Sequence, residues 1–241
     1  MPLLKAPLLD ARADVRHGFT TRFDAMGGRL DLGRAATPEA WAAVADALLL
    51  PGAGVARVHQ NHGATVHRVT RGGVAGQGDG LLTTTPGVLL AVRTADCVPV
   101  LLVQGEPATA VAAVHAGWRG VAADIIGTAL SALRALDAAA PVHAVIGPAI
   151  SGRNYEVGEE VVAAIGATGV PSSVFVARPA GAPRPFADVR AAARWQLARD
   201  GVTCIEQLPQ CTYADPALWS HRRDGRSRGS LAALVGLVAT S

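Results

Sequence analysis

The chain has 241 residues, half of them hydrophobic, and a formal net charge of +3. It is long enough to bury a large core, yet no uninterrupted apolar stretch approaches the roughly 20 residues of a membrane helix, so no membrane partner is expected. Lys5 is the only lysine, which argues against Schiff-base chemistry. Only 4% of the residues are aromatic and no basic block is interleaved with them, so no nucleic-acid partner is expected.

In chain order, the turn residues and the apolar periodicity predict a mixed series of helices and strands. The first long helix is predicted to begin at Thr37 as N-cap, with Pro38 at the first helical position. Helical spacing is found over 37–50, 120–136, 156–166 and 186–201. Runs rich in Val, Leu and Ile predict strands at 17–22, 55–60, 64–69, 87–93, 98–104, 109–115, 141–147, 172–177, 202–208 and 231–238.

The order of these elements indicates the fold class. Several strands between 55 and 115 follow one another without a helix, which does not fit a strictly alternating βαβ protein. We therefore expect an α+β fold with substantial antiparallel sheet, built as two stacked sheets with helices outside. With no internal repeat and no low-complexity linker, residues 1–241 are expected to form a single domain.

The cysteines and the N-terminus indicate the compartment. Cys97, Cys204 and Cys211 form no CxxC pair, so they are not a disulfide framework. Residues 1–18 lack the long apolar region and the small-residue cleavage site of a signal peptide. A cytoplasmic protein with free thiols is expected.

Three residues with metal-ligand chemistry stand at the ends of predicted strands. His62 precedes Gly63 in a turn, Cys97 opens the apolar run of RTADCVPVLLV, and His115 closes that of VAAVHAGWRG. Each alone is more simply a structural residue, and their separations of 35 and 18 residues are too long for a zinc finger. Together, two imidazoles and a thiolate suit Zn²⁺ and leave a fourth position for water, whose pKa an open zinc ion lowers to about 7.

Other catalytic and anion-binding patterns are weak or absent. The sequence contains no HExxH, no HxE…PCxxC, no GxGxxG and no Walker A motif. The glycine-rich stretch AGQGDGLLTTTPG, which includes Asp79, fits a turn, a strand and a second turn better than a phosphate cradle. The C-terminal stretch SHRRDGRSRGS is either a solvated loop or an anion site, since it concentrates four arginines: Arg222, Arg223, Arg226 and Arg228.

Several motifs, read together, resemble the YfiH family, also called the laccase-domain family. They are VHQNHGATV, DGLLTTTPGVLLAVRTADCVPVLL, AVHAGWRG, IGPAISGRNYEVG and SHRRDG, with a weaker N-terminal block in GFTTRFDAMGGRLDLG. The resemblance implies a four-layer α/β/β/α sandwich with mixed, largely antiparallel sheets. It also implies a zinc site ligated by His62, Cys97 and His115, with copper as the alternative metal. Two positions depart from the family pattern, Asp31, where the family usually has asparagine, and Arg228, where its C-terminal GR is not reproduced.

The function implied by this resemblance is a zinc-dependent purine nucleoside phosphorylase, also able to deaminate adenosine. Its partners would be phosphate and a purine nucleoside (adenosine, inosine or methylthioadenosine), and the chain would act as a monomer. In this interpretation Cys97 and Asp96 serve catalysis, Asp96 either as a general acid or base or as a neighbour of the metal ligand. The substrate and anion-binding residues would be Arg222, Arg223, Arg119 and Tyr155.

Two alternatives remain open at this point. The first is a cysteine hydrolase that cleaves an amide in a peptidoglycan precursor, with Cys97 as nucleophile, His115 or His62 as base, and Asp96 orienting the base. The second is copper-dependent polyphenol oxidation, from the family's older name. It fits poorly, because the seven histidines are too few and form no HxH pairs.

Overall fold

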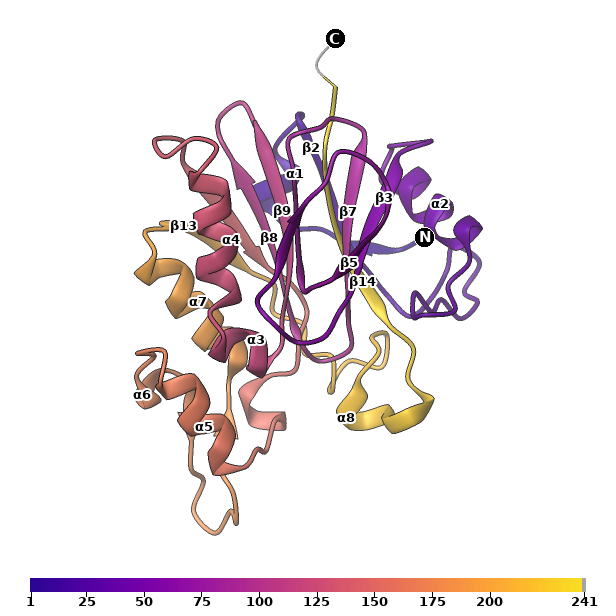
Figure 1. Ribbon diagram of the computed structural model, residues 1–241. Coiled ribbons are helices and arrows are strands. Elements are labelled where there is room, and N and C mark those ends of the chain that lie inside the picture. Colours follow the sequence, from indigo (N-terminus) through magenta and orange to yellow (C-terminus); the bar gives the residue numbers. More distant parts are fainter. Residues whose placement is uncertain (240–241) are drawn as a thin grey trace.

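The computed structural model describes residues 1–239 and shows four layers, two six-stranded sheets stacked face to face with helices on both outer sides (Figure 1). This confirms the predicted α+β class and the α/β/β/α sandwich. Antiparallel pairs occupy the middle of both sheets, and the parallel pairs lie toward their edges. Within the described residues, no helix combines the length and the apolar character that crossing a bilayer requires.

The order of strands shows where the chain passes from one sheet to the other. The first sheet runs in the order β1 (Leu3–Leu4), β2 (Val15–Thr20), β14 (Leu231–Leu237), β7 (Val88–Thr94), β3 (Gly54–His59) and β5 (Gly73–Gln77). The second runs in the order β13 (Cys204–Gln207), β10 (Val142–Ile146), β8 (Val98–Gln104), β9 (Ala110–Ala116), β6 (Gly80–Thr83) and β4 (Val66–Arg68). The consecutive strands β7 and β8 thus belong to different sheets, and residues 95–97 cross between them.

Helices cover the outer faces unequally (Figure 1). The outer face of the second sheet is covered by α3 (Trp118–Ala122), α4 (Ile125–Arg134), α5 (Glu159–Gly166) and α7 (Val189–Arg199). The first sheet is covered by α2 (Pro38–Ala47), which begins as predicted, with the Thr37 hydroxyl accepting from the Ala40 N–H. The remaining short elements are α1 (Pro7–Asp10), α6 (Ser172–Phe175), α8 (His221–Asp224), the 3₁₀ turns Gly152–Asn154 and Gly225–Ser227, and the strand pair β11 (Val176–Ala177) and β12 (Phe186–Ala187).

Strands at the centre of the second sheet are buried on both faces. Every residue of β8 and β9 is buried, with Leu102 packed among the helices and its neighbour Leu101 packed against the first sheet. Such strands read as continuous apolar runs, without the alternation of a half-exposed sheet. Each fully buried leucine contributes roughly 1.5–3 kcal/mol, so these two strands form a rigid support for whatever their ends carry.

Two predicted elements are wrong in part. The helix predicted over 120–136 is divided into α3 and α4 at Asp124, whose φ of 56° is left-handed and whose carboxylate pairs with Arg199 of α7 at 2.8 Å. The strand predicted over 172–177 begins instead as α6, and only Val176–Ala177 is extended. There the burial of Phe175 in the helix-side core overrides the β propensity of the local sequence.

Candidate metal centre and its pocket

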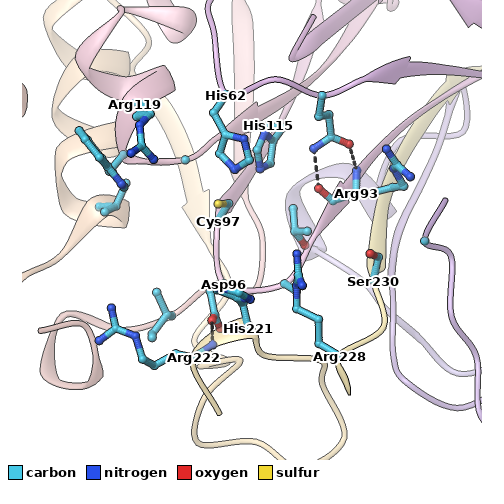
Figure 2. Close-up of a pocket in the computed structure, with 18 of the residues that line it drawn as sticks. His62, Arg93, Asp96, Cys97, His115, Arg119, His221, Arg222, Arg228 and Ser230 are labelled. Atoms are coloured by element: carbon cyan, nitrogen blue, oxygen red, sulfur yellow. Dashed lines mark hydrogen bonds between the residues drawn. The ribbon is translucent and has the colours of Figure 1, made fainter. Parts of the chain in front are cut away.

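His62, Cys97 and His115 lie together at one end of the sandwich (Figure 2). Strands β8 and β9 are antiparallel, with Val98 opposite Ala116, so Cys97 just before β8 comes beside His115 near the end of β9. His62 reaches the same place from the loop that follows β3. The structure therefore brings together the three residues that the sequence analysis grouped.

The donor atoms of the three side chains are close enough to share one ion. One atom from each, an imidazole nitrogen or the thiol sulfur, lies within 4.8 Å of the other two. The rings of His62 and His115 meet edge to face, with centroids 4.9 Å apart and planes at 82°. His115 is only 3% exposed, whereas Cys97 is half-buried and His62 is exposed. The cluster is therefore anchored in the core and open to solvent on the His62 side.

Two neighbouring residues, Gln60 and Gly117, help to fix this geometry. The Gln60 side chain donates to the carbonyl of Arg93 at 2.7 Å and accepts from its N–H at 2.8 Å, which ties the His62 loop to β7. Gly117 follows β9, and a Cβ there would stand 3.0 Å from the sulfur of Cys97 and 3.1 Å from the His62 ring. A side chain at this position would therefore press on both ligands and displace them by a few tenths of an ångström.

Asp79 is the residue that sequence reasoning missed. Its carboxylate is fully buried and accepts from His115 Nδ1 at 2.7 Å, while its second oxygen accepts from the backbone N–H groups of Gly63 at 2.8 Å and Asn61 at 3.2 Å. It lies there because it directly precedes β6, which pairs with β9. One carboxylate thus orients His115 and also holds the loop of His62, as a partner behind a metal ligand does.

The cluster shifts the ionisation of its own members. Burial raises the pKa of the Cys97 thiol, but the adjacent His115 and His62 outweigh it and lower that pKa to about 6. Burial lowers the pKa of His115, but the Cys97 thiolate and the Asp79 carboxylate outweigh it and raise that pKa to about 9. Burial opposes the ionisation of Asp79 as well, yet its hydrogen bonds from His115 and Gly63 keep its pKa below the usual range. Without a metal, the neutral-pH form is a thiolate beside an imidazolium.

The cluster opens into a pocket of about 810 Å³, a size typical of small-molecule sites. Asp96 lines it but is already occupied: one carboxylate oxygen accepts from the Thr212 hydroxyl at 2.6 Å and the other from the Arg222 N–H at 2.6 Å. Its φ of 97° is a strained, left-handed conformation. Asp96 therefore docks α8 against the start of β8, next to Cys97.

The four residues predicted to bind substrate or anion are divided by the structure. Arg222 and Arg119 line the pocket, where they lie over the rings of Tyr155 at 4.8 Å and Trp118 at 4.2 Å. Arg222 also donates twice, at 3.0 Å, to the carbonyl of Glu156. Arg223 is not among the lining residues. Its guanidinium is used within the fold, by Asp224 and by the carbonyls of Thr212, Tyr213, Asp215 and Leu218.

This sandwich, with a histidine–cysteine–histidine cluster in a pocket at one end, defines a laccase-domain protein. The family model described as multi-copper polyphenol oxidoreductase laccase matches residues 20–238, and the chain belongs to that family, the YfiH family. The membership confirms the resemblance drawn from the motifs.

Relatives and solved structures support this assignment across most of the chain. A purine nucleoside phosphorylase of Mycobacterium tuberculosis is 41% identical over 201 residues, which cover 80% of this chain and 76% of the relative. The purine nucleoside phosphorylase YfiH of Escherichia coli is 36% identical over 184 residues, which cover 75% of this chain and 73% of the relative. The crystal structure of YlmD from Geobacillus stearothermophilus matches with a TM-score of 0.86 at 30% identity, covering 99% of this chain and 97% of that one.

Proposed function

We propose that this protein is a zinc-dependent purine nucleoside phosphorylase that acts on adenosine, inosine and methylthioadenosine and also deaminates adenosine. The observation that carries the proposal is the cluster of His62, Cys97 and His115 inside a pocket that also presents arginines and aromatic rings. The names of the relatives support the reaction type.

The donor set fits a zinc ion. Zinc binds imidazole nitrogen at about 2.0–2.1 Å and thiolate sulfur at about 2.3 Å, and the three donors, within 4.8 Å of one another, include both types. Because Asp79 occupies Nδ1 of His115, Nε2 is the atom left for the ion. When bound, zinc supplies a Lewis acid with an open coordination position. Among residues 1–239 this is the single such cluster, which does not favour a multi-copper centre and leaves copper as the alternative ion for the one site.

In phosphorolysis, an oxygen of hydrogen phosphate bonds to the anomeric carbon of the nucleoside as the carbon–nitrogen bond breaks. The bonding pair leaves on the purine, whose nitrogen takes the phosphate's proton, and ribose 1-phosphate is released. The protein serves such a reaction chiefly by orienting its two substrates. Tyr155 and Trp118, each with an arginine over its ring, offer flat surfaces for the purine. Asp96 acts as a positioning residue, because it accepts a hydrogen bond from the backbone N–H of Arg222. Arg223 donates to the carbonyl of Thr212 and so stabilises the loop that also contacts Asp96.

The direct test uses protein purified with its native metal. We expect about one equivalent of zinc by mass spectrometry and base release that requires phosphate with at least one of the three nucleosides. Adenosine alone should also yield ammonia and inosine. The absence of phosphate-dependent base release from all three, with metal-loaded protein, would refute the phosphorylase.

A second candidate function is favoured by one observation, the Cys97 thiolate beside His115, whose other nitrogen is held by Asp79. Nucleophile, base and orienting carboxylate are the parts of a cysteine hydrolase, such as one that cleaves an amide in a peptidoglycan precursor. The carboxylate that orients His115 is Asp79, whereas the sequence analysis gave this task to Asp96. In this candidate the resting thiol is free, whereas in the metal centre it is ligated.

Metal binding is expected to depend on pH. The pKa of His115 is raised to about 9, so at pH 7.5 the ion must displace its proton, whereas Cys97, with a pKa of about 6, is already ionised. Binding should therefore release about one proton, and the apparent affinity should rise roughly tenfold per pH unit up to about pH 9 and then level off. Below about pH 6, where the thiol is protonated too, the dependence should steepen. Competition with a chromophoric chelator between pH 6 and 10 measures this, and an affinity that is flat from pH 7 to 9 would contradict it.

A further inference from the structure

The pocket has a second cationic side, which includes Arg228 from the arginine-rich C-terminal stretch but not Arg119, Arg222 or Arg223. Arg93, Arg228 and Ser230 lie on one side of the metal cluster, and Arg119 and Arg222 lie on the other (Figure 2). Arg34 also lines the pocket, and its charge acts on Arg93. We call Arg34, Arg93 and Arg228 the arginine side, and Tyr155, Trp118, Arg119 and Arg222 the aromatic side.

Arg93 is the central residue of the arginine side. It is half-buried at the end of β7, and within residues 1–239 its guanidinium makes no hydrogen bond or ion pair; only its backbone is bonded, to Gln60. Burial is the first cause that lowers its pKa, followed by the like charges of Arg34 and Arg57. Burying a cation near other cations costs free energy, and a bound anion would offset that cost.

The carboxylates near this side do not neutralise it. Asp31 is the acidic group whose charge acts on Arg93, but its Oδ1 accepts from the N–H groups of Gly33 and Ser230, both at 2.8 Å, and so stabilises the backbone. Asp96, the other aspartate of the pocket, is occupied by Thr212 and Arg222. Five arginines therefore line the pocket together with two aspartates, of which Asp96 uses both carboxylate oxygens within the fold and Asp31 uses Oδ1. The excess of positive charge attracts an anionic ligand.

The two sides also differ in whether their guanidinium groups have partners within the protein. On the aromatic side, Arg222 donates two hydrogen bonds to the Glu156 carbonyl and lies over the ring of Tyr155. Arg119 lies over the ring of Trp118. On the arginine side, within the described chain, the guanidinium groups of Arg93, Arg34 and Arg228 have no such partner. Their forks are free to bind two oxygens of one anion.

We propose that the arginine side is an oxyanion subsite that binds inorganic phosphate through Arg93, with Arg228 and Arg34, while the nucleoside base lies on the aromatic side. Its role in catalysis rests on the proposed phosphorylase. The two substrates would then approach from opposite sides of the metal cluster. In phosphorolysis the phosphate oxygen attacks the anomeric carbon from the face opposite the departing purine, and this division of the pocket supplies that arrangement.

The test is a binding measurement that needs no turnover. Inorganic phosphate is titrated calorimetrically into metal-loaded protein, without nucleoside, for the wild type and the variants Arg93→Gln, Arg228→Gln and Arg222→Gln. A charge-assisted hydrogen bond to an oxyanion is a strong one, so Arg93→Gln should weaken phosphate binding by roughly ten- to a hundredfold. Arg228→Gln, at an exposed position where folding is not at risk, should weaken it about five- to tenfold. Arg222→Gln, the matched control from the aromatic side, should leave it within about twofold.

Nucleoside binding, measured in parallel, should show the reverse order, with Arg222→Gln the variant that weakens it. The proposal is overturned if Arg93→Gln and Arg228→Gln both bind phosphate as the wild type does, if Arg222→Gln is the variant that loses phosphate, or if the wild type binds none. Arginine-dependent phosphate binding without any phosphorolysis would uphold the subsite and refute the proposed function, so the two can fail separately.

Discussion

Replacing Cys97 by alanine should remove the bound metal and about a thousandfold or more of the nucleoside turnover, while the protein stays folded. The sulfur is one of only three donors in the cluster, and its thiolate is the anionic one at neutral pH. A catalytic ion supplies several kcal/mol of transition-state stabilisation, and each 1.4 kcal/mol is tenfold in rate, so its loss amounts to roughly three powers of ten. Metal content by mass spectrometry, thermal unfolding and base release are measured on the same preparation.

The matched control is Cys204→Ala, because Cys204 is also half-buried but lies on β13, outside the pocket. It should keep both metal and turnover. Turnover retained by a metal-free Cys97→Ala protein would contradict the metal-dependent function. Alkylation separates the metal centre from the cysteine hydrolase: in metal-loaded wild-type protein a ligated Cys97 should resist iodoacetamide and become reactive when a chelator is added, whereas a nucleophilic thiol reacts in both cases.

Much of the fold could be predicted from the sequence because the four layers leave a clear pattern. Strand β8 was predicted at the bounds the structure shows, 98–104, since it is buried on both faces and appears as one apolar run. The meeting of Cys97 with His115 follows from the same pattern, because antiparallel neighbours place the start of one strand beside the end of the next. The division between α3 and α4 could not be read from the sequence, because it lies at Asp124, whose backbone is left-handed and whose carboxylate pairs with an arginine 75 residues away.

The residues missed at the site have a common physical reason. Asp79 stands in a glycine-rich stretch, where an aspartate fits a turn equally well, and its role depends on the pairing of β6 with β9. Arg93 closes a predicted core strand, and nothing in RTADC shows that its side chain enters a pocket with other arginines. Conversely, Arg223 belongs to the conspicuous arginine cluster, yet its guanidinium is used by five groups of the fold. Local sequence reveals residue type and strand ends, but the partner of a side chain is set by tertiary structure.

Replacing Asp79 by asparagine should weaken zinc binding by about ten- to a hundredfold without touching a ligand. In the wild type, the Asp79 carboxylate accepts hydrogen bonds on both oxygens, from His115 on one and from the N–H groups of Gly63 and Asn61 on the other. An amide has only one oxygen. If that oxygen faces the backbone, its NH₂ group faces Nδ1 of His115 and drives the ring proton to Nε2, the atom the ion needs. If it faces His115, the NH₂ group opposes the two backbone N–H groups and displaces the loop of His62.

Either orientation costs affinity, so the prediction does not depend on which one the variant adopts. Chelator competition at pH 8 gives the dissociation constant, and Asp46→Asn, the same chemical change on the exposed face of α2, serves as the control and should bind zinc as the wild type does. An Asp79→Asn protein with a zinc affinity within about twofold of the wild type would show that the ion does not need the His115 tautomer that Asp79 selects. The ion would then not be bound through Nε2 of His115. This result would refute the proposed donor set, even if the protein still contained metal.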